Sequence, residues 1–404
     1  MRFLFYSHDG LGLGHTRRHC AVAAALIELA ADVPILMASG TDEVHRLGLP
    51  ACVEVLKMPS LRKSADGGYV SRRLGGLDAS EIKAVRSELL LAAVKSFKPD
   101  VVLADKHPLG AGGEFKDAMV AAKRAGARTA LGLRDILDDP LTVADEWSQH
   151  GIRETIDAFY DLVLIYGDRS IFDPVSSYEF SPAMKRRTRM CGYVVSREQM
   201  DPLCAPGGSL RFERSKQPLV LAATGGGEDG FSLLDAFLRA TRNAPWKGAV
   251  VTGPMVPDHE LRVLRRVAAE SDVDLYPFVP QLPALFGSID ALVCMGGYNT
   301  LAEAVSQGVP AVCAPRTTPR KEQLIRARAF ERLGLLKVLS PEELSPERLR
   351  QAIEVELTQS REQLLYRAYR ALKFDGARQA ASHLLALARK TPSRQRRKTS
   401  LSTA

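Results

Sequence analysis

The residues best suited to chemistry follow an apolar strand in the second half of the chain. That strand, residues 290–294, runs into Gly297, and Asn299 and Thr300 then begin a helix. Backbone N–H groups at a helix start bind phosphate, because they lack an intrahelical partner and the helix dipole favours negative charge. Glu303 lies one turn further on the same face, so its carboxylate can accept hydrogen bonds from sugar hydroxyls. This spacing predicts a nucleoside diphosphate site, and an ordinary capped helix is the alternative.

A second glycine loop follows another apolar strand, residues 219–223. Thr224, Gly225 and Gly226 begin this loop, and its amides together with the helix start at Gly297 could hold two phosphates without a metal. No acidic cluster of the Asp-x-Asp kind stands at the end of a predicted strand, which argues against bound Mg²⁺. We therefore expect no metal and no cofactor.

A third glycine loop precedes the first helix of the chain. Gly10, Gly12 and Gly14 lack the G-x-G-x-x-G spacing, and no acidic residue closes the second strand, so a nicotinamide dinucleotide is not expected. His15 stands at the helix start, where the dipole favours the neutral imidazole that accepts a proton. His15 is a candidate general base, and a capping histidine without chemistry is the alternative.

Apolar strands and helical stretches alternate through both halves of the chain. Strands are expected at 2–7, 33–38, 101–104, 128–133 and 162–165, and then at 219–223, 248–252, 273–276, 291–294 and 311–314. Helices are expected at 15–30, 80–97, 113–125 and 142–159, and then at 231–242, 258–269, 300–307 and 322–333. This alternation is typical of α/β proteins with doubly wound parallel sheets.

We therefore expect two Rossmann-like domains that face each other across a cleft. The first spans residues 1–198 and the second residues 218–388, with a linker at 199–217 that is rich in Pro, Gly and charge. The last helix of the second domain could pack back on the first. Residues 389–404 carry six cations and no acid, and we expect a disordered basic tail there.

Ligands of parallel sheets bind at the carboxyl ends of the strands. In the first half, this places Asp105, His107 and Arg134 at the predicted cleft, and Asp105 is a second candidate for the base. In the second half, Arg316 follows the strand at 311–314 and lies close to Arg320 in the sequence. If the domains face each other, these groups line one cleft.

Composition limits the class of protein further. The chain has 404 residues, 46% hydrophobic and 25% charged, as in soluble globular proteins. The tail supplies six of the eight net positive charges, so the body is not expected to bind nucleic acid. The six cysteines have no metal-type spacing, no apolar run approaches the roughly 20 residues of a membrane span, and no signal peptide is expected. These features favour a cytoplasmic protein.

Three motifs carry a resemblance to a known family: GLGLGHTRR at 10–18, ATGGGEDG at 223–230, and YPFVPQLPALFGSIDALVCMGGYNTLAEAVSQGVPAVCAPR at 276–316 with RKEQ at 320–323. In this order, they resemble the two-domain (GT-B) nucleotide-sugar glycosyltransferases. The nearest family is that of the bacterial N-acetylglucosaminyltransferase that acts on the lipid-linked peptidoglycan precursor. The resemblance covers nearly the whole chain, and the last motif is the most specific.

The resemblance implies a role for each matching residue. The C-terminal domain would hold the nucleotide-sugar and the N-terminal domain the acceptor, with Gly12, Gly14, His107 and Arg134 on the acceptor side. His15 would lie at the reacting centre, and Arg316 or Arg320 could stabilise charge on the departing diphosphate. The donor would be held by backbone at Phe278 and Val279 (base), by Glu303 (ribose), by Gly297, Asn299 and Thr300 (diphosphate), and by Glu322 and Gln323 (sugar).

The chain also departs from that family. Thr16, Arg17 and Arg18 replace an apolar segment with proline, and the loop TGGGED at 224–229 replaces a glycine-glycine-serine start. The loop at 104–110 also differs from the glycine-rich loop of the peptidoglycan enzyme. We therefore expect a relative that acts on another acceptor.

Two basic patches bear on that acceptor: Lys57, Arg62, Lys63, Arg72 and Arg73, and residues 185–189. Solvated surface is the simpler interpretation. The alternative is a lipid-linked or anionic acceptor, with peripheral contact to the inner face of an anionic membrane.

Together these features predict a metal-independent, inverting transfer of a sugar from a UDP-sugar to an acceptor hydroxyl. His15, or with less support Asp105, would remove the hydroxyl proton. An epimerase or hydrolase of nucleotide-sugars on the same fold is one alternative. A catalytically silent nucleotide-sugar-binding scaffold protein is another.

Overall fold

The structure, a computed structural model, describes residues 1–8, 14–41, 44, 49, 52–63, 69–195, 216–279 and 281–390. The predictions for Gly12, for the linker before residue 216 and for the tail after residue 390 lie outside these ranges. Within them, no helix combines the length and the hydropathy needed to cross a bilayer.

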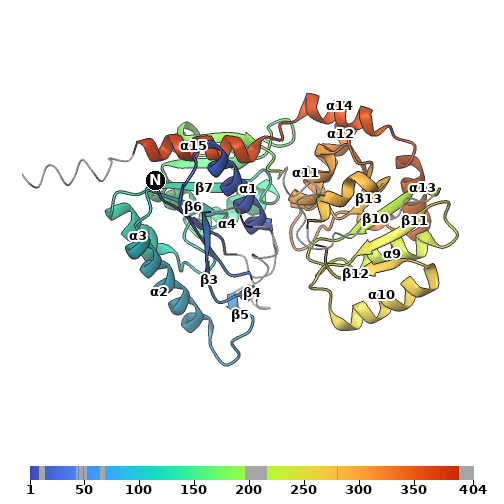
Figure 1. Cartoon of the computed structure of the whole chain (residues 1–404), viewed down its shortest axis with the longest axis horizontal. Helices are drawn as coiled ribbons and strands as arrows, with labels where there is room; N and C mark the ends of the chain where they lie inside the picture. Colours follow the sequence, from blue (N-terminus) through green and yellow to red (C-terminus); the bar gives the residue numbers. More distant parts are fainter. Residues whose placement is uncertain are drawn as a thin grey trace, which may run out of the picture.

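The N-terminal domain is built on a seven-stranded parallel sheet with the strand order β3-β2-β1-β6-β7-β8-β9 (Figure 1). The strands are β1 (Phe3–Tyr6), β2 (Ile35–Ser39), β3 (Val53–Lys57), β6 (Val101–Asp105), β7 (Arg128–Arg134), β8 (Leu162–Tyr166) and β9 (Thr188–Gly192). An antiparallel hairpin of β4 (Leu61–Lys63) and β5 (Tyr69–Ser71) stands apart from this sheet.

Strand β1 shows how the sequence produces two covered faces. Successive side chains of a strand point to opposite faces. Phe3 and Phe5 pack into one apolar cluster with α1 and α15, whereas Leu4 and Tyr6 pack into another with α2 and α3. The helices of this half are α1 (Gly14–Leu29), α2 (Ala79–Phe97), α3 (Lys116–Arg124), α4 (Pro140–Gln149), α5 (Ile152–Phe159), α6 (Pro174–Ser177) and α7 (Pro182–Arg187).

The C-terminal domain is built on a six-stranded parallel sheet with the order β12-β11-β10-β13-β14-β15. Val220 and Ala222 of its central strand pack toward α9, α10 and α13, and Leu221 and Ala223 pack toward α11 and α12. The strands are β10 (Leu219–Ala223), β11 (Lys247–Val251), β12 (Asp274–Tyr276), β13 (Ala291–Cys294), β14 (Ala311–Cys313) and β15 (Lys337–Val338). The helices are α9 (Phe231–Thr241), α10 (Asp258–Ser271), η3 (Leu282–Ser288), α11 (Tyr298–Ser306), α12 (Glu322–Arg332), η4 (Pro341–Glu343), α13 (Pro346–Glu356), α14 (Arg361–Ala371) and α15 (Gly376–Arg389).

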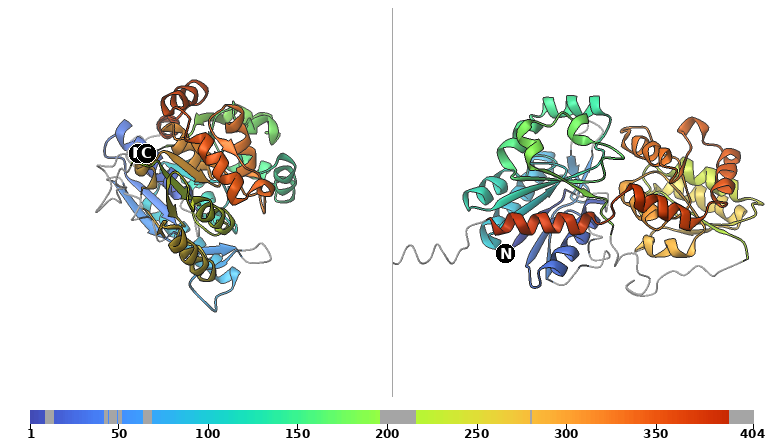
Figure 2. Two further views of the ribbon diagram at one scale, coloured as in Figure 1. Left: turned by 90° about the vertical axis from the view of Figure 1, so that its right-hand side faces the viewer. Right: turned by 90° about the horizontal axis from the view of Figure 1, so that it is seen from above.

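These two sheets confirm the predicted fold class, an α/β protein with two doubly wound parallel domains. The last helix, α15, returns to the N-terminal domain and packs along α1 (Figure 2). Ala380, Ala381 and Leu384 bury its inner face, and Val194 pairs with Asp375 in a short antiparallel bridge just before it. The chain therefore crosses between the domains twice.

The structure differs from the expected elements in two ways. The single helix expected at 142–159 is two helices, α4 and α5, because Gly151 between them adopts a left-handed conformation with φ of 56°. Strands β3, β4, β5, β9 and β15 were not expected, because each has at most five residues and none is an uninterrupted apolar run. Helices α6, α7, α13 and α14 were not among the expected ranges either.

One ion pair joins the two domains in their common interior. Arg326 of α12 and Asp135, which directly follows β7, are both fully buried, with Nη2 2.8 Å from Oδ1 and Nε 3.0 Å from Oδ2. The Tyr193 hydroxyl donates to Asp135 at 2.9 Å, and Arg326 Nη1 donates to the Gly296 carbonyl at 3.2 Å. The pair therefore links the end of β7 to the glycine turn after β13.

We predict that Arg326→Ala lowers the free energy of unfolding by about 3–5 kcal/mol, because it leaves the Asp135 carboxylate buried without a cation. Urea denaturation measures this loss. The control is Arg239→Ala, which removes a solvent-accessible pair with Asp235 on one helix and should cost far less than Arg326→Ala. Replacing both buried partners, as Asp135→Leu with Arg326→Met, should cost less than Arg326→Ala alone. An equal loss for the exposed and the buried pair would contradict this account.

Candidate active site

A pocket of about 260 Å³ lies between the domains at the carboxyl ends of their strands. It gathers many of the residues that the sequence assigned to a nucleotide-sugar, and it adds residues from the opposite domain. The C-terminal domain contributes Gly225, Gly226, Phe278, Val279, Gly297, Asn299 and Thr300, and the N-terminal domain contributes Gly14, Arg17, Arg18 and Arg134. Thr224 instead donates its hydroxyl to the Thr252 carbonyl at 2.8 Å, which holds the loop in place.

The starts of two helices converge on this pocket. Helix α1 begins at Gly14 and α11 begins at Tyr298. The side-chain Nδ2 of Asn299 donates to the Gly14 carbonyl at 3.4 Å. A Cβ on Gly297 would meet nothing within 4 Å, so the backbone there is open to a ligand. Because both helix dipoles present their positive ends, this geometry suits a diphosphate held from both domains.

Arg134 adds to the same pocket a cation that has an unsatisfied hydrogen-bond donor. It ends β7, and its Nε is buried without a hydrogen-bond partner among the described residues. Burial, followed by the nearby Arg18 and Arg326, lowers the pKa of Arg134 to about 10. A group that burial and like charges destabilise in this way is stabilised by an anion. Arg134 therefore points to a negatively charged ligand.

Glu303, expected to bind ribose, is held by the opposite domain. It is 5% exposed, and Arg17 Nη2 donates to its Oε1 at 2.5 Å. Burial raises the pKa of Glu303, and Arg17 opposes that rise. A ribose would have to compete with Arg17 for this carboxylate. The sequence marked Arg17 as unusual, because it is one of the residues that depart from the family. The sequence did not show its pairing with Glu303, because the two residues are 286 positions apart.

The two candidates for the base form one centre. His15 Nδ1 lies 2.9 Å from Asp105 Oδ1, and Arg18 Nη2 lies 2.8 Å from both Asp105 Oδ2 and His15 Nδ1. Burial alone would raise the pKa of Asp105, but Arg18 and His15 outweigh it and hold this pKa far below its ordinary range. An ionised carboxylate of this kind is a poor base and a good acceptor. Asp105 can therefore orient His15 by accepting a hydrogen bond from its Nδ1–H, which leaves Nε2 free to accept a proton.

Two further histidines extend this centre. The His8 ring lies 4.8 Å from the His15 ring and 4.4 Å from the His107 ring, centroid to centroid. Burial and then the neighbouring imidazoles lower the pKa of His8 well below its ordinary value, so His8 is neutral. Across the described parts of the chain, no group of three or more His, Cys, Asp or Glu has the arrangement of a metal site. The sequence assigned no role to His8, although its place at the carboxyl end of the first strand marks it as a cleft residue.

A wider cleft of about 880 Å³ adjoins the pocket and contains His15, Arg134 and Glu322. Arg316 pairs with Asp229 and, at 3.1 Å, with Glu322, while Gln323 accepts a hydrogen bond from the Arg316 backbone at 3.2 Å. Burial would raise the pKa of Glu322, but Arg134 and Arg316 lower it overall. The structure thus brings the predicted sugar-binding groups to the edge of the cleft.

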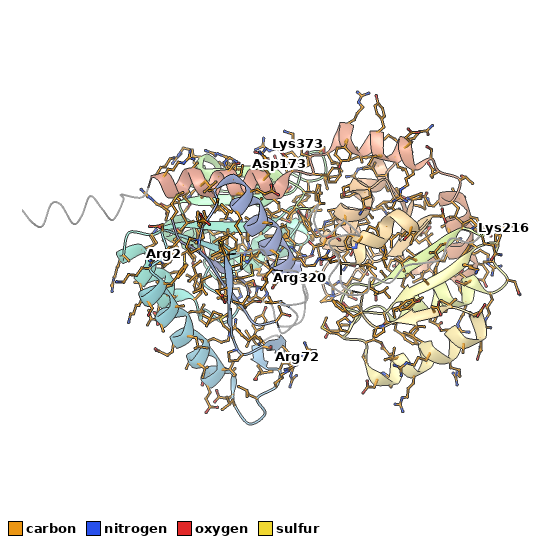
Figure 3. All side chains as sticks on the ribbon, in the orientation of Figure 1. Arg2, Arg72, Asp173, Lys216, Arg320 and Lys373 are labelled. Carbon is orange, nitrogen blue, oxygen red and sulfur yellow. The ribbon has the colours of Figure 1, made fainter. Side chains whose placement is uncertain are left out.

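Arg320 lies where the two domains meet (Figure 3). It pairs with Asp138 at 3.4 Å and with Glu146 at 3.1 Å. Both partners belong to the N-terminal domain, so Arg320 bridges the cleft and is less available for a diphosphate than Arg134.

Comparisons with known proteins agree with this site. Residues 236–384 match the glycosyltransferase family 28 C-terminal domain, a range that holds every predicted donor residue from Phe278 to Gln323. The chain has the GT-B fold, as shown by the calicheamicin glycosyltransferase CalG4 (TM-score 0.61, 18% identity, covering 97% of this chain and 99% of that chain). MurG of Acinetobacter baumannii is a second such structure (TM-score 0.54, 15% identity, 96% and 99%). The predicted resemblance is confirmed at these two levels, domain and fold.

Relatives in sequence match over shorter segments. The transferase named UDP-N-acetylglucosamine–N-acetylmuramyl-(pentapeptide) pyrophosphoryl-undecaprenol N-acetylglucosamine transferase of Bacillus pumilus is 31% identical over 105 residues, 26% of this chain and 29% of that protein. The protein of the same name from Caldanaerobacter subterraneus is 25% identical over 154 residues, 37% and 42% respectively. The matches span less than half the length of either relative.

The fold alone does not separate transfer from epimerisation. A candidate UDP-N-acetylglucosamine 2-epimerase from Listeria monocytogenes is also similar in structure (TM-score 0.62, 14% identity, 95% of each chain). The choice of activity therefore depends on the side chains of the site.

We predict that Arg17→Ala costs about 1–3 kcal/mol of stability near pH 7 and much less near pH 4. The variant loses the cation that opposes the raised pKa of Glu303, so that pKa rises further. Below the ordinary value of 4.5, the carboxyl is protonated in both folded and unfolded chains and no charge is left unpaired. As pH rises through the interval between 4.5 and the raised pKa, the folded state alone bears the penalty.

Urea denaturation at both pH values measures this difference. The double variant Arg17→Ala/Glu303→Gln carries no ionisable group at position 303, so its deficit should not depend on pH. Equal deficits of Arg17→Ala at the two pH values would contradict the pairing.

Proposed function

We propose that this protein is a glycosyltransferase that moves a sugar from a UDP-sugar to an acceptor hydroxyl, with inversion and without a metal. The main support for the proposal is the 260 Å³ pocket. Two helix starts and Arg134, a cation with an unsatisfied donor, meet there beside His15. The family 28 domain over residues 236–384 supports the same activity.

The donor would lie across the pocket of about 260 Å³ between the domains. Its base would contact the backbone at Phe278 and Val279, and its ribose would displace Arg17 from Glu303. Its diphosphate would lie between the starts of α1 and α11, within reach of Arg134. The displaced Arg17 guanidinium then remains beside the diphosphate as a further cation, because α1 lines the same pocket.

The reaction would use His15 as the general base. Its Nδ1–H would donate a hydrogen bond to the ionised Asp105, and its Nε2 would take the proton of the acceptor hydroxyl. The hydroxyl oxygen attacks the anomeric carbon, the bond from that carbon to the diphosphate breaks, and UDP leaves. Arg134 and the helix dipoles would stabilise the charge that develops on the leaving group, which removes the need for a metal.

Positive charge along the wider cleft bears on where in the cell the protein acts. Arg62 and Arg72 are exposed and line this cleft. We propose a cytoplasmic protein in which these cations, with the basic tail, give peripheral contact to anionic lipid at about 1 kcal/mol for each residue near the surface.

We predict that Glu303→Ala weakens donor binding about ten- to a hundredfold, because it removes charge-assisted hydrogen bonds worth roughly 1.5–3 kcal/mol. Calorimetric titration with UDP-N-acetylglucosamine and UDP-glucose measures the change. Glu354→Ala, at an exposed position of α13, is the matched control and should bind like the wild type. Unchanged affinity in Glu303→Ala would remove this carboxylate from the donor site.

We predict that His15→Ala lowers kcat about 10²- to 10⁴-fold while donor affinity is retained. Asp105→Asn should also lower kcat, because an amide cannot enforce the Nδ1–H tautomer as an ionised carboxylate does. Release of UDP during turnover with an acceptor panel measures both effects, and incubation with donor alone monitors epimerisation. Full turnover in His15→Ala, or quantitative epimerisation of the donor without an acceptor, would refute the mechanism.

A further inference from the structure

The N-terminal domain contains a second cavity, of about 520 Å³, beside the cleft. The loop after β6 (residues 106–113), α4 and α5 form its walls. It shares Tyr69, Lys106 and Arg320 with the cleft that contains His15, so the two spaces adjoin. Its volume falls in the range of pockets that hold a drug-sized molecule.

The walls of this cavity combine apolar and polar side chains, and several of these side chains are aromatic rings. Trp147 is 6% exposed and is fixed by Phe180, with ring centroids 5.7 Å apart and planes 29° apart. On the side of the cleft, the His107 ring meets His8 and Tyr69 edge-on, at 85° and 82°. Rings in such positions favour a planar guest, because they can offer both faces and edges to an aromatic system.

The loop after β6 requires glycine at a position that packs closely against the domain interior. Gly110 has φ of +88°, and a Cβ there would lie 2.6 Å from Glu114 Oε2 and 2.9 Å from the Tyr6 hydroxyl. That carboxylate is fixed by buried Arg86, with Nη2 2.9 Å from Oε1, so it cannot yield. Glycine is therefore required at position 110, and Gly110, Gly112 and Gly113 contribute only backbone to the cavity wall.

The cavity is close to charge balance. Its cations are Lys106 and Arg320, and Arg320 is matched by Glu146 on the cavity wall and by Asp138 behind it. A pyrophosphate group would need a cation with an unsatisfied donor and open helix N–H groups, as Arg134 and the starts of α1 and α11 provide in the 260 Å³ pocket. This second cavity instead fits an uncharged guest.

We propose that this cavity holds the body of the acceptor, an uncharged planar aromatic compound whose hydroxyl extends past His107 and His8 to His15. The proposal rests on the proposed transferase activity and names its acceptor class. The hydroxyl proton passes to His15, the hydroxyl oxygen bonds to the anomeric carbon, and the diphosphate leaves with the electrons of the broken bond. The neutral His8 provides a polar ring edge along that path without repelling a protonated His15.

The chain offers an internal reporter for this site. It has two tryptophans, Trp147 in the cavity and Trp246 in the C-terminal core, stacked on Phe237 at 5.6 Å. Trp246→Phe leaves Trp147 as the one fluorophore of this kind. The probe is 7-hydroxy-4-methylcoumarin, a planar hydroxyl compound that absorbs where tryptophan emits. We expect saturable quenching of Trp147 with Kd of about 1–100 μM in the absence of any donor, which is typical of a small ligand in a fitted pocket.

A steric variant and its control locate the binding. Ala111 lines the cavity, so Ala111→Phe in the Trp246→Phe background should weaken quenching at least tenfold. Ala125, exposed at the end of α3 and close to the amino end of β7, is the control, and Ala125→Phe should bind the coumarin normally. Absence of saturable quenching in Trp246→Phe itself, or equal affinity in the two alanine variants, would overturn the proposal.

Two further arms separate this inference from the transferase. Vesicles that contain undecaprenyl phosphate should not displace the coumarin, and displacement would indicate a lipid-linked acceptor and overturn the class proposed. Binding of UDP-sugar without binding of coumarin contradicts the acceptor class alone. Binding of coumarin without binding of any UDP-sugar contradicts the transferase and, with it, the acceptor role of the cavity.

Discussion

The buried pair of Arg326 and Asp135 is the constraint on which the arrangement of this site depends. Removing two charges from water is costly, and the pair is tolerated because Tyr193 and the Gly296 carbonyl complete its hydrogen bonds. These partners come from both domains, so the pair is satisfied only when the end of β7 faces the glycine turn after β13. Arg134 precedes Asp135, and Gly297 follows Gly296. The same contact therefore sets the distance between the cation and the open backbone that would share a diphosphate.

A second consequence is a concentration of positive charge that the protein only partly neutralises. The starts of α1 and α11 face each other, and Arg18 lies over the Tyr298 ring at 5.3 Å while it pairs with Asp105. Arg17 forms an ion pair with Glu303, whereas the Nε of Arg134 has no carboxylate partner among the described residues. A diphosphate would complete this balance. The 260 Å³ pocket and the histidine centre are thus electrostatically coupled, since Arg18 belongs to both.

Local sequence was sufficient for the parts of this site that depend on local physics. Apolar strands, glycine turns and helix starts follow from hydrophobic pattern and backbone freedom, and they led to Gly297, Asn299 and the end of β6 at Asp105. Pairings across the domain boundary could not be read in this way. Arg17 reaches Glu303, and Arg326 reaches Asp135, because of how two sheets face each other, a relation that no periodicity of one segment records. The break between α4 and α5 was within reach, since a glycine inside a helical pattern is a warning.

The departures from the family now form a physical pattern. The matched range, residues 236–384, holds the proposed donor residues from Phe278 to Gln323. One departure, the loop at 224–229, lies in the C-terminal domain just before that range, whereas Arg17, Arg18 and the loop after Asp105 lie in the N-terminal domain. Those residues lie in or beside loops at the carboxyl ends of parallel strands, which can change without disturbing the hydrogen-bonded sheet below. A new acceptor therefore requires only that such loops reshape the cavity while His15 keeps its place on α1. Because α15 packs along α1 and α1 carries both His15 and Arg17, that place is fixed by the fold and not by the acceptor loops.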